Sequence, residues 1–505
     1  MTRRLPAALP EIARSACDLA AFLIPAIAYV LAVSHEPASW DTAELQGVPY
    51  ILGISHPTGF PVYVLLGWIW SHALPIGTIA FRLNAFSAVA VAAAVGCAYA
   101  VALELGARRP LALLAALWLA FAHTIWAHAI RAEAQDVALA FSTIAIYAIV
   151  RWLKGGSNVW YASAFALYGL ALAAHPNAIW ILPGFVLATV FAKRRPTWRL
   201  MFGSAGLVVA GLSFSLYVPL RSAYIHAHGL DPTAALPGIA LAGSGASIFW
   251  NYNAPYTWSG LWRELTGSES STPHVFLSSF SPSHWQDALW AFLKGTNEQY
   301  GAFALALAIV GLGLAWKRDW RTALVLFVTC TAALLFAVTY VAEGDTDRYR
   351  MLSLWMIAPL MAVAAPSGED VANGFGRFVL CIFLAVGVWS AFAAGHSFYN
   401  HELREGGRWI IDRVTPVVPP GSVIIADWVD ATSLAYGAYA DRTLPGRIVV
   451  SGWWPDKTDL YRRWAKPGRR VFILADPKDL PAPPFGWHSY RLLDRYHQLY
   501  EVTQP

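Results

Sequence analysis

Two carboxylic acids near the amino terminus, Asp41 and Glu44, are the clearest candidates for chemistry. They are three residues apart, so on a helix they would share one face. A carboxylate held there could accept a proton from a hydroxyl group. The same spacing is typical of a helix cap, with Asp41 as the N-cap residue and Glu44 as its capping-box partner. The two interpretations are compatible, because a capping aspartate is also held rigidly.

A turn follows the two acids. His56 and Pro57 begin the sequence His-Pro-Thr-Gly, which is a turn signal. On sequence alone, a structural turn is favoured over a catalytic histidine. The loop that carries both the acids and the turn, residues 35–60, contains no lysine or arginine.

Four more polar residues lie beside apolar runs, where polar groups are costly and therefore candidates for function. Arg131 and Glu133 form either a local ion pair or an interfacial anchor. His175 precedes a proline and indicates a turn at a helix terminus. Arg221 either extends to the lipid headgroups or holds a phosphate with its guanidinium group.

An acidic loop ends in Asp347 and Arg348, after Glu343 and Asp345. Exposed acids of this kind are usually just solvated, but oxygen ligands also suit magnesium or manganese. No full ligand set is visible, so a divalent cation stays an open option and no other cofactor is indicated. The sequence contains no P-loop and no Gly-x-Gly-x-x-Gly after a strand. A membrane enzyme without such a loop is suited to a lipid-linked, pre-activated donor.

The composition indicates which elements position these residues. Of the 505 residues, 57% are hydrophobic and 13% are charged, against about 25% charged in an ordinary soluble protein. This excludes a cytosolic enzyme, a disordered protein and a nucleic-acid-binding protein, and it predicts an α-helical polytopic membrane protein. About eleven spans are expected, at residues 16–34, 80–105, 110–128, 136–152, 159–175, 177–192, 200–219, 299–316, 322–341, 351–365 and 377–395. The short apolar run 61–75 is expected to be an interfacial or re-entrant helix.

The basic residues orient these spans, since cytoplasmic loops carry the excess of lysine and arginine. With the N-terminus in the cytoplasm, alternate loops hold the basic clusters at 3–14, 108–109, 151–154, 193–199 and 317–321. We therefore expect a multi-pass protein of the inner (plasma) membrane. The first apolar run is interpreted as an uncleaved anchor rather than a signal peptide.

Three segments then gather on the outer face: the loop 35–60, a long loop 220–298 and the tail 396–505. The tail alternates strand-like runs at 423–425, 448–450 and 471–474 with helix-like stretches at 400–414 and 457–464. The predicted organisation is a transmembrane domain, 1–395, followed by a small extracytoplasmic α/β domain, 396–505.

The first loop resembles the protein O-mannosyltransferase-like membrane family called domain of unknown function 2723. In that family an Asp-x-x-Glu pair precedes Leu-Gly-x-x-His-Pro-x-Gly-x-Pro. The matching residues here are Asp41, Glu44, Leu52, Gly53, His56, Pro57, Gly59 and Pro61. Weaker matches follow at Arg82-Leu83-Asn84, Ala132-Glu133, Leu216 to Arg221, Asn253-Ala254-Pro255 and Leu265-Thr266-Gly267.

The resemblance implies the GT-C glycosyltransferase architecture, a polyprenyl-phosphate sugar as donor and a first-loop aspartate as base. Asp41 would then be the base and Glu44 its catalytic neighbour, with Arg221 first and Arg131 second for the donor phosphate. The residues expected at the substrate or in the supporting loops are His56, Pro57, Glu133, His175, Asp347 and Arg348. Relatives transfer mannose to protein hydroxyls, and the acceptor here is expected to be a protein, a lipid or a glycan.

Two other functional classes compete with this hypothesis. A polysaccharide ligase or polymerase would use a lipid-diphosphate donor at the same membrane face, and sequence separates it poorly from a monosaccharide transferase. A transporter or flippase would place polar groups near the membrane midplane and often shows repeated halves, and the sequence shows neither.

Overall fold

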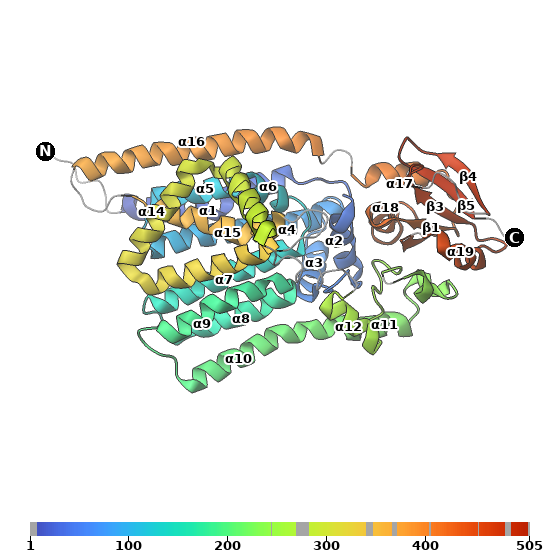
Figure 1. Ribbon diagram of the computed structural model, residues 1–505, viewed down its shortest axis with the longest axis horizontal. Helices are drawn as coiled ribbons and strands as arrows, with labels where there is room; N and C mark the ends of the chain where they lie inside the picture. The colour runs from blue at the N-terminus through green and yellow to red at the C-terminus, as the bar shows by residue number, and fades with distance from the viewer. Residues whose placement is uncertain are drawn as a thin grey trace.

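The computed structural model describes residues 8–243, 245–268, 282–339, 347–365, 371–402, 406–452, 454–479 and 486–502. A bundle of helices lies at one end, and a smaller region with a β-sheet lies at the other (Figure 1). Glu343 and Asp345 fall outside the described residues, as does the side chain of Asp347.

Helices dominate the chain as far as residue 402. They are α1 (Ala8–Ala32), α2 (Trp40–Ile51), α3 (Pro61–Ala73), α4 (Ile79–Glu104), α5 (Arg109–Phe121), α6 (His123–Ala129), α7 (Ala134–Leu153), α8 (Asn158–Ala174), α9 (Leu182–Phe191), α10 (Trp198–Leu212), α11 (Tyr217–Ala227), α12 (Trp258–Thr266), α14 (Pro282–Thr339), α15 (Met351–Val363) and α16 (Val371–Glu402). Short 3-10 turns join several of them, among them η1 (Pro176–Ile181) and η5 (Asp347–Arg350).

Each predicted span coincides with one of these helices, with a consecutive pair or with a segment of α14. By length and composition, five of the described helices could cross a membrane, or six if α5 and α6, which meet at 67°, form one span. Others, such as α8 with 17 residues, are shorter than the roughly 20 residues of a typical span. The prediction of several apolar membrane helices is therefore confirmed, whereas helix length does not establish the number eleven.

The long helix α14 is interrupted at two residues, Gly301 and Asp319. Gly301 adopts a positive φ of 76°, and Asp319 has φ −156° and ψ 87°, outside the helical region. The second interruption lies between the predicted spans 299–316 and 322–341. There the Asp319 carboxylate lies 3.2 Å from the ammonium group of Lys154, which anchors this break to the end of α7.

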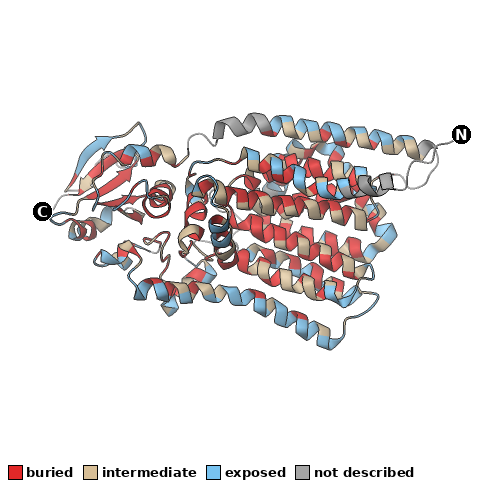
Figure 2. Ribbon diagram, turned by 180° about the vertical axis from the view of Figure 1, so that it is seen from behind, coloured by how far each residue is buried: buried red, intermediate tan, exposed pale blue. Residues whose placement is uncertain are grey.

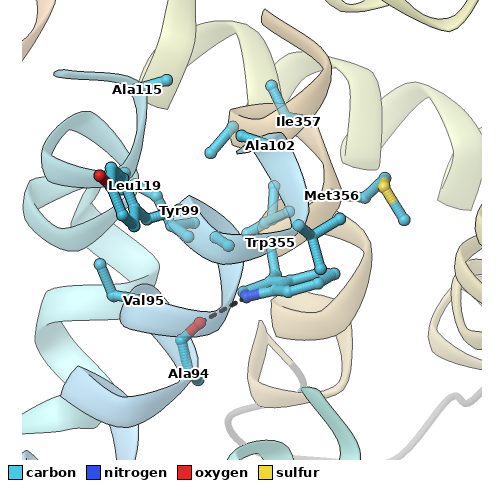
Figure 3. Close-up of a cluster of buried hydrophobic side chains, with 14 of the residues drawn as sticks. Ala94, Val95, Tyr99, Ala102, Ala115, Leu119, Trp355, Met356 and Ile357 are labelled. Carbon is cyan, nitrogen blue, oxygen red and sulfur yellow. Dashed lines mark hydrogen bonds between the residues drawn. The ribbon is translucent and has the colours of Figure 1, made fainter. Parts of the chain in front are cut away.

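The bundle interior is closely packed around Trp355 of α15. Its side chain is 1% exposed, and its indole N–H donates a 2.7 Å hydrogen bond to the carbonyl of Ala94 on α4 (Figure 3). By contrast, much of α10 and of the described part of α16 on the outside of the bundle is exposed (Figure 2), and the exposed residues include the large apolar Phe202 and Trp389. Apolar side chains that face outward in this way suit contact with lipid.

The carboxyl-terminal region contains a mixed five-stranded sheet in the order β2-β1-β3-β5-β4. β1 pairs in parallel with β2 and β3, and β5 pairs antiparallel with β3 and β4. The elements of this region are α17 (Arg408–Val414), β1 (Val423–Ala426), α18 (Trp428–Ala435), β2 (Ile448–Ser451), α19 (Thr458–Trp464), β3 (Val471–Ala475), β4 (Trp487–Leu492) and β5 (Gln498–Val502). The three predicted strand runs coincide with β1, β2 and β3, whereas β4, β5 and α18 were not predicted.

We expect Trp355→Ala to lower the unfolding free energy of the bundle by about 3–5 kcal/mol, because it leaves a cavity in a closely packed interior. Trp389→Ala on the outward face of α16, where the indole is 70% exposed, is the matched control and should change stability little. Thermal unfolding of the detergent-solubilised full chain measures both. Equal melting temperatures for the two variants would contradict the packing described here.

Candidate active site

Asp41 lies in the first turn of α2. Ser39 is the N-cap of this helix, and no side chain caps it. The capping interpretation of Asp41 and Glu44 is therefore wrong. Both carboxylates are instead engaged by residues from elsewhere in the chain, which leaves the interpretation as a chemical site.

Glu44 organises the turn that follows α2. Its side chain is 0% exposed. It accepts hydrogen bonds from the Ser55 hydroxyl at 2.8 Å and from the backbone N–H of His56 at 2.9 Å, and it also pairs with Nδ1 of His56. The turn closes where the N–H of Gly59 donates to the His56 carbonyl at 2.8 Å. Gly59 has φ 77°, a conformation that favours glycine.

His56 connects the two acids of α2. Its Nε2 atom lies 4.0 Å from an Asp41 carboxylate oxygen. Burial alone would lower the pKa of His56, but the carboxylates of Glu44 and Asp41 outweigh it and raise the pKa to about 9. Burial alone would likewise raise the pKa of Asp41, but the charges of His56 and Arg348 lower it. At neutral pH the pair is therefore an imidazolium beside an ionised carboxylate.

Arg348 joins this pair to a second acid. It lies in η5, directly before α15. One guanidinium nitrogen donates to Asp41 at 3.1 Å, and the other donates to Glu133 at 3.2 Å. Glu133 also lies 3.3 Å from Nε of Arg131. Opposite charges therefore alternate from Arg131 to Asp41. The ion pair of Arg131 and Glu133 that the sequence allowed is present, and Arg348 joins it to Asp41.

Asn84, in the Arg-Leu-Asn match of the sequence, holds the Glu133 segment against α2. Its side-chain oxygen accepts from Gln46 of α2 and from the backbone N–H of Ala132, both at 2.9 Å. Gln135 in turn donates to the Arg348 carbonyl at 2.9 Å. These bonds fix the distance between Glu133 and Asp41.

The remaining predicted loop residues surround His56. Pro57 lies in the turn itself. Phe60 meets the His56 ring edge-on, with ring centres 5.0 Å apart, and stacks on His175 at 5.3 Å. His175 follows α8, and its Nδ1 accepts from the N–H of Asn177 at 3.1 Å. The predicted turn at a helix terminus is thus present, and the same histidine also packs against the site.

Arg221 lies at the opposite end of α2 from Asp41. It donates to the carbonyls of Leu52 at 2.6 Å and Ile51 at 3.3 Å. A helix rises about 1.5 Å per residue, so these carbonyls are roughly 15 Å from the Asp41 backbone. The structure therefore does not bring Arg221 next to Asp41, and a cation at this helix end interacts favourably with the orphan carbonyls.

The site also contains a residue that the sequence analysis did not single out. The indole N–H of Trp428, at the start of α18, donates to Asp41 at 2.8 Å. The Asp-Trp-Val-Asp sequence around it has no motif that indicates chemistry. Only the start of a short capped helix at Asp427 could have been recognised.

A metal site was left open by the sequence. Within the described ranges, no group of three or more histidine, cysteine, aspartate or glutamate side chains could hold a metal ion. The acidic loop that suggested a cation lies mostly outside those ranges.

The geometry around Asp41 can be compared with known proteins. Residues 41–198 match the family model described as the protein O-mannosyl-transferase TMEM260 N-terminal domain. The resemblance predicted from the first loop is confirmed. The chain is 25% identical to mouse protein O-mannosyl-transferase TMEM260 over 213 residues, which cover 41% of this chain and 30% of that protein. It is 28% identical to the Dictyostelium discoideum protein of the same name over 120 residues, covering 23% of this chain and 15% of that protein.

The fold is similar to solved structures of the GT-C superfamily. ArnT from Cupriavidus metallidurans in the apo state aligns with a TM-score of 0.54 at 13% identity, covering 98% of this chain and 100% of that one. The same protein bound to undecaprenyl phosphate aligns with a TM-score of 0.51 at 11% identity, covering 96% of this chain and 99% of that one. AglB from Archaeoglobus fulgidus, in complex with an inhibitory peptide and a dolichol-phosphate, aligns at 0.51 and 11%, covering 92% and 70%. At sequence identities of 11–13%, these alignments show similarity of fold and nothing further.

The raised pKa of His56 makes a prediction about stability. A histidine whose pKa is near 9 when folded, above its ordinary 6.5, stabilises the fold below about pH 6.5 and loses that contribution as pH rises toward 9. Glu44→Gln removes the carboxylate that raises this pKa most. We therefore expect the melting temperature of Glu44→Gln to fall less than that of the wild type over this interval.

The comparison with the variant is needed because a second histidine titrates in the same interval. The hydrogen bond with Asp430 raises the pKa of His497 to about 9 as well, so the wild-type curve contains both contributions. Asp430→Asn is the matched control, since it should reduce only the His497 contribution, which Asp494 also supports. A Glu44→Gln curve parallel to the wild-type curve would show that the Glu44–His56 pair does not titrate as described.

Proposed function

We propose that this chain is a membrane glycosyltransferase that moves a hexose from a polyprenyl-phosphate carrier to a hydroxyl group at the extracytoplasmic membrane surface. The observation that carries the proposal is the position of Asp41, an ionised and 23% exposed carboxylate held between Arg348 and His56. The named relatives are O-mannosyl-transferases, so mannose is the first sugar to test. The acceptor is a protein, a lipid or a glycan.

The chemistry needs one carboxylate. The phosphate of the donor is already a stable leaving group, so no general acid is required, unlike glycoside hydrolysis, which uses two carboxyl groups. Asp41 accepts the proton of the acceptor hydroxyl as its oxygen forms a bond to the anomeric carbon. The bond from that carbon to the phosphate oxygen breaks, its electron pair leaves with the polyprenyl phosphate, and the anomeric centre is inverted.

A carboxylate with a lowered pKa suits this role. It stays ionised when the acceptor binds, and the hydroxyl becomes acidic only as its oxygen bonds to the sugar. His56 and Arg348 keep Asp41 charged, and Glu44 positions His56 from inside the protein. We therefore assign Asp41 as the base and Glu44 as a positioning residue.

Arginine neutralises the departing phosphate. Arg131 and Arg348 belong to the charge chain that ends on Asp41, whereas Arg221 binds the far end of α2. The donor phosphate is bonded directly to the anomeric carbon that is attacked beside Asp41, so its binding residues must lie close to that carboxylate. We therefore place Arg131 and Arg348 ahead of Arg221 for this role, since a guanidinium group suits a phosphate anion.

The proposed topology follows the basic loops, with eleven spans, a cytoplasmic N-terminus and the carboxyl-terminal domain outside the inner membrane. This puts the turn at 53–60 and α3 at the membrane surface. The prenyl chain of the donor then lies in the bilayer between spans, while its phosphate reaches the arginines. In the solved ArnT and AglB complexes the bound lipids are undecaprenyl phosphate and dolichol-phosphate.

Asp41→Asn should lower sugar transfer by about 100-fold or more, the range in which a general base acts. The assay follows radiolabelled mannose from a synthetic polyprenyl-phosphate mannose into envelope fractions of a strain that lacks this protein. Asp459→Asn, at an 84% exposed carboxylate on α19, is the matched control and should keep the wild-type rate. Transfer by Asp41→Asn near that rate would exclude Asp41 as the base.

The KM for the donor distinguishes Arg131 from Arg221 as the residue that binds the donor phosphate. Arg131→Ala should raise the KM for the polyprenyl-phosphate donor by about tenfold or more, since a hydrogen bond to a charged group contributes about 1.5–3 kcal/mol. Arg221→Ala should lower the melting temperature, because the α2 carbonyls lose their donor, with a smaller change in that KM. A larger rise of this KM in Arg221→Ala than in Arg131→Ala would instead assign phosphate binding to Arg221.

A further inference from the structure

The carboxyl-terminal region contacts the proposed base directly. The Trp428 indole N–H reaches one oxygen of Asp41 at 2.8 Å, and Arg348 reaches the other at 3.1 Å. We propose that Trp428 is a positioning residue for the glycosyl transfer, so that the carboxyl-terminal region completes the site formed by the helical bundle. The inference rests on the proposed function, because it assumes that Asp41 accepts the proton.

An indole suits this position. It is a neutral donor that cannot accept or release a proton, so it orients a carboxylate without competing for the acceptor's hydrogen. A carboxylate offers about four lone-pair directions, and Trp428 and Arg348 use two of them. His56 Nε2 lies 4.0 Å from the same carboxylate, and the 23% exposure of the Asp41 side chain leaves room for an incoming hydroxyl to approach it. The Trp428 ring also meets His56 edge-on with ring centres 5.7 Å apart, and Tyr252 in the same manner at 5.9 Å.

The helix that carries Trp428 is tied to the chain just before α2. In α18, the Ser433 hydroxyl donates to the Ala38 carbonyl at 3.2 Å. The backbone N–H of Gly407, before α17, donates to the same carbonyl at 3.1 Å. The approach is so close that a Cβ atom on Gly407 would lie 2.2 Å from that oxygen. Ala38 is three residues before Asp41, so these bonds set the distance between Trp428 and the carboxylate.

The two regions also share one hydrophobic core. Leu45 and Val48 of α2 belong to the same buried cluster as Leu434 and Ala435 of α18. The Tyr436 hydroxyl accepts a 2.9 Å hydrogen bond from the backbone N–H of Ala80 at the start of α4. A donor on elements held in this way keeps its geometry more closely than one on a free loop. Figure 1 shows α18 next to α2, at the end of the bundle.

Loss of the indole N–H has two expected effects on catalysis. The Asp41 carboxylate loses one of its two oriented donors, so turnover falls. Its pKa also rises, because this hydrogen bond helps to lower it, so the acid limb of the pH–rate profile moves to higher pH. The charged groups that face Asp41 are Arg348 and His56, with Glu133 and Glu44 behind them, and the substitution leaves all four in place.

The test is Trp428→Phe in the full chain, which keeps an aromatic ring and removes the N–H. With the polyprenyl-phosphate mannose assay, we expect kcat to fall about tenfold, as for a hydrogen bond to a charged group, and the acid limb to shift upward. Trp464→Phe is the matched control. Its indole donates to the Pro237 carbonyl at 2.9 Å, so it loses the same kind of bond in the same region and should keep the wild-type pH profile.

A second variant leaves Trp428 unchanged and serves if Trp428→Phe fails to fold. Gly407→Ala forces the Ala38 contact apart and should produce the same shift of the acid limb. The inference would be overturned if Trp428→Phe, or Gly407→Ala in its place, kept the wild-type kcat and pH profile. In that case an inactive Asp41→Asn would still support the proposed function. An active Asp41→Asn would instead overturn the proposed function itself.

Discussion

Glu44 is a carboxylate without access to solvent, and the candidate site depends on how its charge is balanced. A buried charge is costly unless it is paired and hydrogen-bonded. Here the Ser55 hydroxyl, the His56 backbone and the His56 ring provide that balance. The turn therefore has to close against α2, and His56 has to lie within reach of Asp41.

The same requirement extends along a chain of alternating charges. His56 lies between Glu44 and Asp41, and Arg348 lies between Asp41 and Glu133, so each of the three inner members has an opposite charge on either side. Removing one partner of a buried pair typically costs about 3–5 kcal/mol, because the other is left uncompensated. The arrangement is therefore organised before any substrate binds, which is what electrostatic catalysis requires.

The carboxyl-terminal region is part of this arrangement. Its α18 helix and the α2 helix of the bundle contribute to one buried cluster, and the Ala38 carbonyl receives hydrogen bonds from Gly407 and Ser433. A soluble domain linked only by a tether would not show this shared core. Residues of β1, such as Ile424 and Ala426, belong to the same cluster, so the sheet packs with the helix that carries Trp428.

Local patterns in the sequence determined much of the fold. Long apolar runs have to form helices in a membrane, because every backbone polar group must be paired there, and these runs predicted where the helices lie. Short apolar runs rich in β-branched residues predicted β1, β2 and β3 in the same way. The Asp-x-x-Glu spacing and the turn after it, together with the family resemblance, marked Asp41, Glu44 and His56 as candidates.

Only the tertiary structure decided which of these groups meet. Arg348 is 307 residues from Asp41, and Trp428 is 387 residues away, so no local pattern connects them. The sequence favoured Arg221 as the phosphate ligand, whereas packing places it at the opposite end of α2. It also suggested that Asp41 caps a helix, whereas in the folded chain Asp41 accepts hydrogen bonds from Arg348 and Trp428. Helix formation depends on near neighbours, but the pairing of charges depends on how the helices pack, and this is why the composition of the site could not be derived from the sequence alone.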